Sequence, residues 1–387
     1  MQALTWKNLK EALAHGSMLR IQQHLEPTGS GGLVYPPTYG GGGHIFREAW
    51  IEDERRQIVV LDSPQSQSNR IEEALLAAHR RGDIRYPDIE ITVPSPMGQE
   101  HYSILQLSHR VYDAALLLTE QDGIPFKRTD VGKAIYGARL ERATGLHVHA
   151  PVTLVLGGWD SHSGGGPLSA KIPRVVTSEI VGVDAIPAQR GAVKFDPMDI
   201  RKGAGPVYES QDPERVFELD KKHAKEKKDK NPSDVGLGNV PSTEERGASI
   251  RYALQSSLVS LAAVRRLRFE DDQGQLDLQR DRAGQVSTVA LGLYGLLAQM
   301  EAGYFLRSGC DLIPTSTPTL EVVGRTLEEV EHFAIGPNDA RALLERSLEE
   351  AEEVGLAWRR ETMSVTADDR LQVLVRRSRE TAQAEEE

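Results

Sequence analysis

Residues 157–180 read GGWDSHSGGGPLSAKIPRVVTSEI, and the apolar run PVTLVL (151–156) leads directly into them. Five glycines, a Trp, an Asp and a His stand within ten residues, and a Lys and an Arg follow, three residues apart. A continuously apolar run of this length is typical of a central strand, and RVVTSEIVGV (174–183) predicts another strand. Bare backbone between two strands, followed by positive charge, is suited to an anionic ligand.

Phosphate is the natural ligand for such a stretch, because backbone N–H groups can approach it closely and cations can neutralise it. The spacings G-x-x-x-x-G-K-[ST] and G-x-G-x-x-G are both absent, so a nucleotide-hydrolysing site is poorly supported. A cradle for the backbone of a polymer remains open, and the alternative is a flexible surface loop without a ligand. The residues that we expect to face such a ligand are Trp159, His162, Ser163, Gly164, Gly165, Gly166, Lys171 and Arg174.

A second polar stretch, DSPQSQSNRIEE (62–73), stands at a predicted junction of strand and helix. Its serines are accounted for as helix caps, but the amides and the arginine exceed what capping requires. Amide and hydroxyl groups bind phosphate and 2′-hydroxyl oxygens, and a helix N-terminus adds partial positive charge. Binding and purely structural roles are both open. The candidates here and elsewhere are Gln65, Gln67, Asn69, Arg70, His109, Arg110, Lys194 and Arg307.

A metal site is the competing chemical interpretation. His147 and His149 fall on one face of a possible strand in LHVHA, and Asp160 and His162 follow. Such a set could bind zinc or manganese and support a metal-dependent hydrolase. No H-E-x-x-H motif, G-x-S-x-G motif or S-x-x-K spacing accompanies it, so scattered structural histidines are the simpler explanation.

The order of predicted elements indicates an α+β fold with long insertions. Residues 203–246 interrupt the pattern with six lysines between Lys221 and Lys230, as in a charged insertion or a solvated linker. We therefore expect a body formed by residues 1–202 and 247–320, and an acidic, mostly helical region over 321–387 with terminal strands. Strands are predicted at 18–24, 56–62, 88–93, 363–367 and 370–376, and helices at 66–80, 256–267 and 283–304.

Composition places limits on the setting of the protein. The single cysteine, Cys310, excludes a disulfide framework and a cysteine-rich zinc site. No apolar stretch approaches 18 residues and the N-terminus lacks a signal peptide, so we expect a cytoplasmic protein with no membrane partner. Most of the net charge of −11 lies beyond residue 320, where 17 acidic residues face 9 basic ones. The rest of the chain is close to neutral and can carry a basic groove locally.

Taken in order, these segments resemble a known family. They are YPPTYGGG, LDSPQSQSNRIEEAL, LSHRVYDAALL, LVLGGWDSHSGGGPLSAKIPRVVTSEIVGVD, KFDPMDI, GLGNVPS, SLAAVRRLRF and LRSGCDL. As a set they resemble the backbone RAMP subunit ("Cas-seven") of type I-G, formerly I-U, CRISPR effector complexes. The resemblance runs from about residue 17 to about residue 315, and the region after residue 320 carries no motif of this family.

The resemblance implies an RRM-like, ferredoxin-like palm with inserted finger and thumb segments, of which 203–246 is the candidate. It implies that copies assemble head to tail along a CRISPR guide RNA, which they hold by its sugar-phosphate backbone and present to target DNA. It further implies no catalytic role and no cofactor. The partners would be a large subunit, a guide-processing subunit and a helicase-nuclease. A protein-interaction scaffold that binds no nucleic acid is a further alternative.

Overall fold

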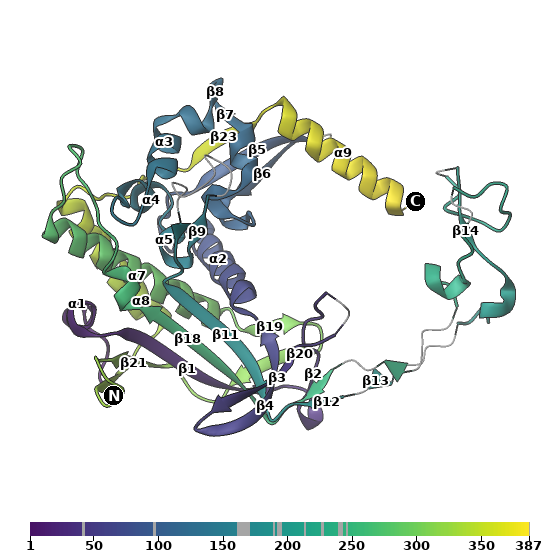
Figure 1. Ribbon diagram of the computed structural model, residues 1–387, viewed down its shortest axis with the longest axis horizontal. Coiled ribbons are helices and arrows are strands. Elements are labelled where there is room, and N and C mark those ends of the chain that lie inside the picture. Colours follow the sequence, from purple (N-terminus) through teal and green to yellow (C-terminus); the bar gives the residue numbers. More distant parts are fainter. Residues whose placement is uncertain are drawn as a thin grey trace.

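The main body is an antiparallel sheet with two long helices, α2 and α7, packed on it (Figure 1). The computed structural model describes the chain except residues 41–42, 96–97, 161–170, 189, 192–195, 213, 226–227, 239–242, 245–246 and 387. Within these described residues the sheet has nine strands. They are β1 (Met18–Pro27), β3 (Phe46–Ile51), β4 (Glu54–Asp62), β11 (Val176–Val183), β18 (Tyr252–Ser260), β19 (Tyr304–Arg307), β20 (Cys310–Pro314), β21 (Thr319–Val323) and β22 (Val330–Ala334).

The connectivity of this sheet is RRM-like. Strand β1 leads through the β3–β4 hairpin to helix α2 (Pro64–Arg81), and β11 and β18 are followed by helix α7 (Leu278–Glu301) and then β19 to β21. Across the sheet, β20 and β21 lie beside β1, β1 beside β18, and β18 beside β11. This is the ferredoxin-like arrangement with the β3–β4 hairpin added beyond β11, so the predicted α+β, RRM-like fold is confirmed.

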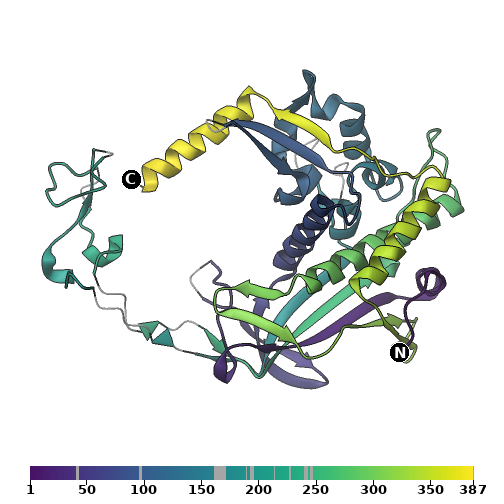
Figure 2. The ribbon, with the colours of Figure 1, turned by 180° about the vertical axis from the view of Figure 1, so that it is seen from behind.

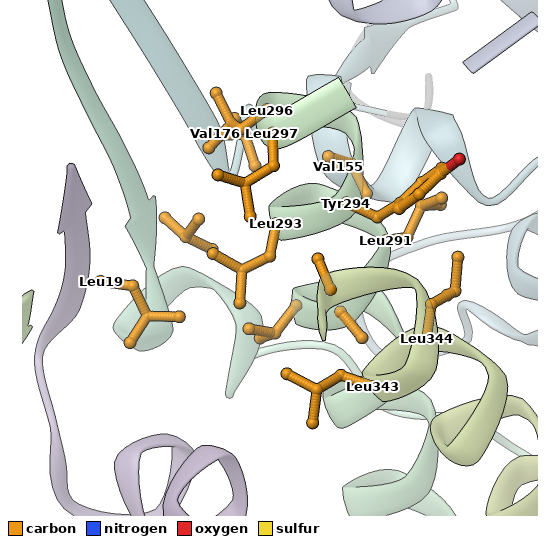
Figure 3. Close-up of a cluster of buried hydrophobic side chains, with 14 of the residues drawn as sticks. Leu19, Val155, Val176, Leu291, Leu293, Tyr294, Leu296, Leu297, Leu343 and Leu344 are labelled. Carbon is orange, nitrogen blue, oxygen red and sulfur yellow. The ribbon is translucent and has the colours of Figure 1, made fainter. Parts of the chain in front are cut away.

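Helix α7 is buried around most of its circumference. It lies among the sheet, α2 and α8 (Pro337–Glu353), and its leucines contribute to the core cluster drawn in Figure 3. Its close approach to the sheet depends on glycine, because a Cβ at Gly292 would lie 2.7 Å from a methyl group of Val176. No helix in the described part of the chain is both long enough and apolar enough to cross a bilayer.

A second unit lies beside the body and contains a smaller, mixed sheet. Its strands, in spatial order, are β6 (Gly98–Ser103), β5 (Ile89–Ser95), β23 (Met363–Ala367), β7 (Thr119–Gln121) and β8 (Ile124–Pro125). Its short helices are α3 (Asp130–Gly137), α4 (Thr144–His149) and α5 (Val152–Leu156), with 3₁₀ turns at Arg110–Tyr112 and Ala114–Leu118. Helix α9 (Asp369–Glu386) projects from this unit (Figure 2).

The last 67 residues do not stay together. Strands β21 and β22 extend the main sheet, α8 packs on α7, and β23 pairs in parallel with β5 of the second unit. The remaining helices of the body, α1 (Trp6–His15) and α6 (Leu261–Val264), flank the same core. The C-terminal region therefore joins the body to the second unit.

The charged insertion forms an arm that leaves the body beside β12 (Ile186–Pro187) and β17 (Ala248–Ser249), which pair with each other (Figures 1 and 2). Its outer part contains β14 (Tyr208–Glu209) and β15 (Phe217–Glu218). Two lysines of the predicted basic run form ion pairs inside the arm, Lys221 with Asp229 and Lys230 with Glu209. Part of this positive charge is thus used to hold the arm together.

Three local predictions were wrong. The apolar run at 151–156 forms helix α5, and residues 370–376 lie in helix α9. Conversely, the first part of 256–267, predicted to be helical, belongs to strand β18 at the centre of the sheet. An apolar run buries itself equally well as helix or strand, so the tertiary setting decided the form of α5. Residues 370–376 contain no fully buried residue, and this reason does not apply to them.

Candidate nucleic-acid interface

A surface cleft of about 1100 Å³ opens where the start of α2, the turn at residues 108–110 and the short ribbon β9–β10 meet. The ribbon pairs β9 (Gly158–Trp159) with β10 (Lys171–Ile172). The residues that line the cleft are Gln65, Ser108, His109, Arg110, Leu140, Leu156, Gly157, Gly158, Trp159, Lys171, Ile172, Pro173, Arg174 and Arg266. Among these described lining residues four are Lys or Arg and none is acidic, so the cleft favours an anion.

Six residues predicted from sequence meet in this cleft although they come from three separate segments. They are Gln65, His109, Arg110, Trp159, Lys171 and Arg174. The cleft also contains Arg266, which sequence reasoning missed. It lies in VRRLRF, where no local pattern separates it from the neighbouring arginines, and only the folded chain brings it here.

The ribbon presents an aromatic ring and a cation together. The Trp159 side chain is 60% exposed, and the Lys171 ammonium lies 5.4 Å from its ring centroid, in cation–π contact. A Cβ at Gly158 would lie 2.8 Å from both Thr153 and the Tyr112 ring, so glycine allows the ribbon to pack this closely.

Arg110, which lines the cleft, connects its own turn to helix α2 and to the start of the ribbon. Its guanidinium donates through Nε and Nη2 to the Glu72 carboxylate and through Nη1 to the Gly157 carbonyl oxygen, at 3.1 Å. Glu72 is buried, which raises the pKa of its carboxyl to about 7 against the opposing effect of Arg110. The main chain of Arg110 has φ = +53°, a left-handed conformation that is uncommon for a residue other than glycine.

The other cleft cations differ in how far they are available. Arg174 is half-buried and donates to the carbonyl oxygens of Leu156 and Pro64 at 3.4 and 3.3 Å. Burial, and then the nearby charge of Arg110, lowers its pKa. Lys171 and Arg266 are exposed, as are Gln65 and His109. The exposed cations are best placed to meet a ligand first.

The polar stretch at the start of α2 divides between surface and interior. Asp62 is fully buried and accepts hydrogen bonds from Ser66, Gln67 and Arg70. It also forms an ion pair with Arg307. The side-chain oxygen of Gln67, Oε1, accepts hydrogen bonds from Ser178 Oγ at 2.7 Å and from Gln255 Nε2 at 2.9 Å. Gln67 is therefore part of an internal network and has no exposed surface for RNA.

The two arginines on Asp62 also have structural partners. Arg70 Nη2 donates a hydrogen bond to the Leu306 carbonyl oxygen at 2.7 Å, and so satisfies a backbone acceptor of edge strand β19. Arg307 Nη1 donates to the Leu61 carbonyl oxygen at 2.8 Å. Asn69 is exposed but lines a different groove, of about 550 Å³, along α2. None of the three lines the cationic cleft, and we revise our expectation for them accordingly.

Six predicted contacts lie outside the described residues, and their predictions stand as made. They are His162, Ser163, Gly164, Gly165, Gly166 and Lys194.

The residues of the metal alternative do not converge in the described part of the chain, where no three His, Cys, Asp or Glu side chains are placed to share an ion. His147 and His149 lie on helix α4, not on a strand. His147 is buried beside Phe269 and Trp358 and donates through Nε2 to the Leu356 carbonyl oxygen at 3.1 Å. Burial lowers the pKa of both histidines to about 4.

Asp160, the third residue of the metal alternative, lies near Tyr112 and Tyr136. Burial, and then the charge of Asp160, raises the pKa of both tyrosine hydroxyls.

Comparison with known families gives one result. Residues 19–187, just under half of the chain, match the family described as CRISPR-associated protein GSU0053. The matched region runs from β1 to β12 and includes every cleft residue except Arg266. No curated protein matches the chain. The family match supports a CRISPR-associated role for this protein.

Proposed function

We propose that this protein is the guide-RNA-binding backbone subunit of a type I-G CRISPR effector, with no catalytic role of its own. Copies assemble head to tail along one guide RNA, and each holds a few nucleotides by the sugar-phosphate backbone. Base pairing of the guide then reads the target DNA. The other subunits that the resemblance implies, a large subunit, a guide-processing subunit and a helicase-nuclease, complete the effector.

The observation that carries the proposal is the cationic cleft. The described residues that line the cleft include four Lys or Arg side chains and no acidic one, and an exposed tryptophan lies beside them. Cations neutralise phosphates, and an aromatic ring can stack on a base, which together suit a single-stranded nucleic acid.

The test is a titration of purified protein with fluorescent single-stranded RNAs of unrelated sequence at several salt concentrations. The double variant Lys171→Ala/Arg266→Ala should bind all of them more weakly by a similar factor, because phosphate contacts carry no sequence information. The slope of log affinity against log salt should shrink by about 1.4, or about 0.7 for each lost phosphate contact.

The matched control removes two exposed cations elsewhere on the surface. In Lys7→Ala/Arg346→Ala the lost side chains belong to α1 and α8 and pair with Glu11 and Glu349. This variant should bind as the parent does. A loss confined to some RNA sequences, or an equal loss in the control, would count against the proposal.

A further inference from the structure

Arg110 lies in the cleft but offers little of itself to a ligand. Its side chain is only 12% exposed, and each of its three guanidinium nitrogens donates to the protein: two to Glu72 and one to Gly157. Lys171 and Arg266, in contrast, are exposed on the same cleft. The cations of the cleft thus fall into a solvent-facing class and an internally bonded class.

The bonds of Arg110 join three walls of the cleft. Glu72 belongs to α2, Arg110 begins the first 3₁₀ turn of the second unit, and Gly157 leads into the ribbon that carries Trp159. Gly157 has φ = +80°, and a Cβ there would lie 3.0 Å from the backbone of Arg174 and Ile172. The ribbon therefore begins at a tightly packed residue, Gly157. The carbonyl oxygen of Gly157 accepts a hydrogen bond from the Arg110 side chain.

We infer that Glu72 and Arg110 are positioning residues for the nucleic-acid site, which fix the start of the Trp159–Lys171 ribbon and do not contact phosphate. This inference rests on the proposed function. It changes the role expected for Arg110 from sequence. It also explains why a buried carboxylate lies under a cleft built for an anion: Glu72 orients a guanidinium whose planar fork reaches both the carboxylate and a carbonyl.

Lysine cannot reproduce this geometry, since a single ammonium cannot hold both oxygens of Glu72 and the Gly157 carbonyl at once. Arg110→Lys therefore keeps the charge and loses the bridge. Glu72→Gln/Arg110→Gln removes both charges together, so that no unpaired charge is left buried. The pair of variants keeps the test valid if one of them folds poorly.

The experiment measures affinity for single-stranded RNA across a salt series. Both variants should bind several-fold more weakly than the parent, with the slope of log affinity against log salt unchanged. Lys171→Gln, which loses a phosphate contact, should instead shrink the slope by about 0.7. If Arg110 contacted phosphate, Arg110→Lys would keep most of the affinity and the neutral double variant would lose slope as Lys171→Gln does.

A spectroscopic readout separates positioning from a general effect on folding. The Trp159 contribution to fluorescence is obtained by subtracting the spectrum of each protein carrying Trp159→Phe. It should change in Arg110→Lys well below the melting temperature, because the ribbon loses its anchor. The inference would be overturned by an unchanged Trp159 signal or by retained RNA affinity in Arg110→Lys. It would also be overturned by a smaller slope of log affinity against log salt in Glu72→Gln/Arg110→Gln. Each of these outcomes would leave the proposed function intact. If Lys171→Gln changed neither affinity nor slope, the proposed function itself would fail.

Discussion

Two buried carboxylates govern the charge of the surface above them. Asp62 is bonded by Arg70 and Arg307, and Glu72 by Arg110, so three arginines serve as counterions in or near the interior. A buried charge is tolerated when it is paired and hydrogen-bonded. Of these three arginines only Arg110 lines the cleft, and because Glu72 pairs with it, the cationic character of the cleft depends on Lys171, Arg174 and Arg266.

The raised pKa of Glu72 makes a prediction about stability against pH. Its folded-state pKa of about 7 lies above the ordinary value of 4.5, so the folded protein binds this proton more tightly than the unfolded chain. The stabilisation is fully present below pH 4.5 and is lost as the pH rises through 7. Between pH 7 and pH 5 the parent should therefore gain about 2 kcal/mol of unfolding free energy relative to Glu72→Gln.

Chemical denaturation of both proteins at the two pH values measures this difference. His147 and His149, whose pKa values are lowered to about 4, act in the opposite direction as the pH falls, but they are common to both proteins and cancel. Glu73→Gln, on the exposed side of the same helical turn, is the matched control. An identical pH response in the parent and Glu72→Gln would contradict this description of Glu72.

Sequence reasoning found the right segments for the cleft and less often the right residues within them. Gln65 and Gln67 stand two apart on α2, yet one is exposed and the other is sealed against Ser178 and Gln255. Residue type indicated polar chemistry in both cases. Which side chain faces solvent depends on partners more than a hundred residues away, which no local pattern reveals.

At the scale of elements, α7 and the strands around it were only partly readable. The long helix was expected from its length and apolar content, and β1, β4 and β11 from their runs of apolar residues. Among the failures, α5 is buried at every position, which erases the periodicity that separates helix from strand. Strand β18, in contrast, alternates buried and exposed residues from Gln255 to Val259 and was still predicted to be helical in part. Their form is set by neighbours: β18 hydrogen-bonds β1 on one side and β11 on the other.

The packing of α7 can be tested at Gly292. Alanine has the higher helix propensity by about 1 kcal/mol, but its Cβ at this position would meet Val176 at 2.7 Å. Overpacking of this kind costs about 1–3 kcal/mol, so we expect Gly292→Ala to be destabilising overall in urea denaturation. Gly137→Ala, where a Cβ meets nothing within 4 Å, is the control and should not destabilise. A stabilised Gly292→Ala would show that the contact is looser than described.

At the scale of the whole molecule, an RRM-like body carries a second unit on one side and an arm on another (Figure 1). The buried hydrophobic clusters of the described residues include none from the arm between residues 189 and 246. The arm therefore contributes little to the stability of the body. A long, exposed extension of this kind suits contact with other molecules, as the proposed assembly requires.

Deleting the arm separates these two roles. Ala188 N donates to the Gly247 carbonyl oxygen at 3.1 Å, so residue 188 can be joined to residue 247 by a short turn. The shortened protein should melt within a few degrees of the parent. It should fail to form guide-bound assemblies of several copies, as judged by mass after co-expression with its partners. Loss of folding, or full assembly without the arm, would contradict this division of roles.

If this protein holds a guide RNA, as we propose, that RNA should remain with it during purification, and the bound nucleic acid can be identified directly. The protein is co-expressed with a CRISPR array and its partner subunits and purified, and the bound nucleic acid is extracted, treated with RNase or DNase, and sized. We expect RNase-sensitive material of uniform length that carries repeat sequence. Protein that is folded and assembled with its partners yet free of nucleic acid would contradict it.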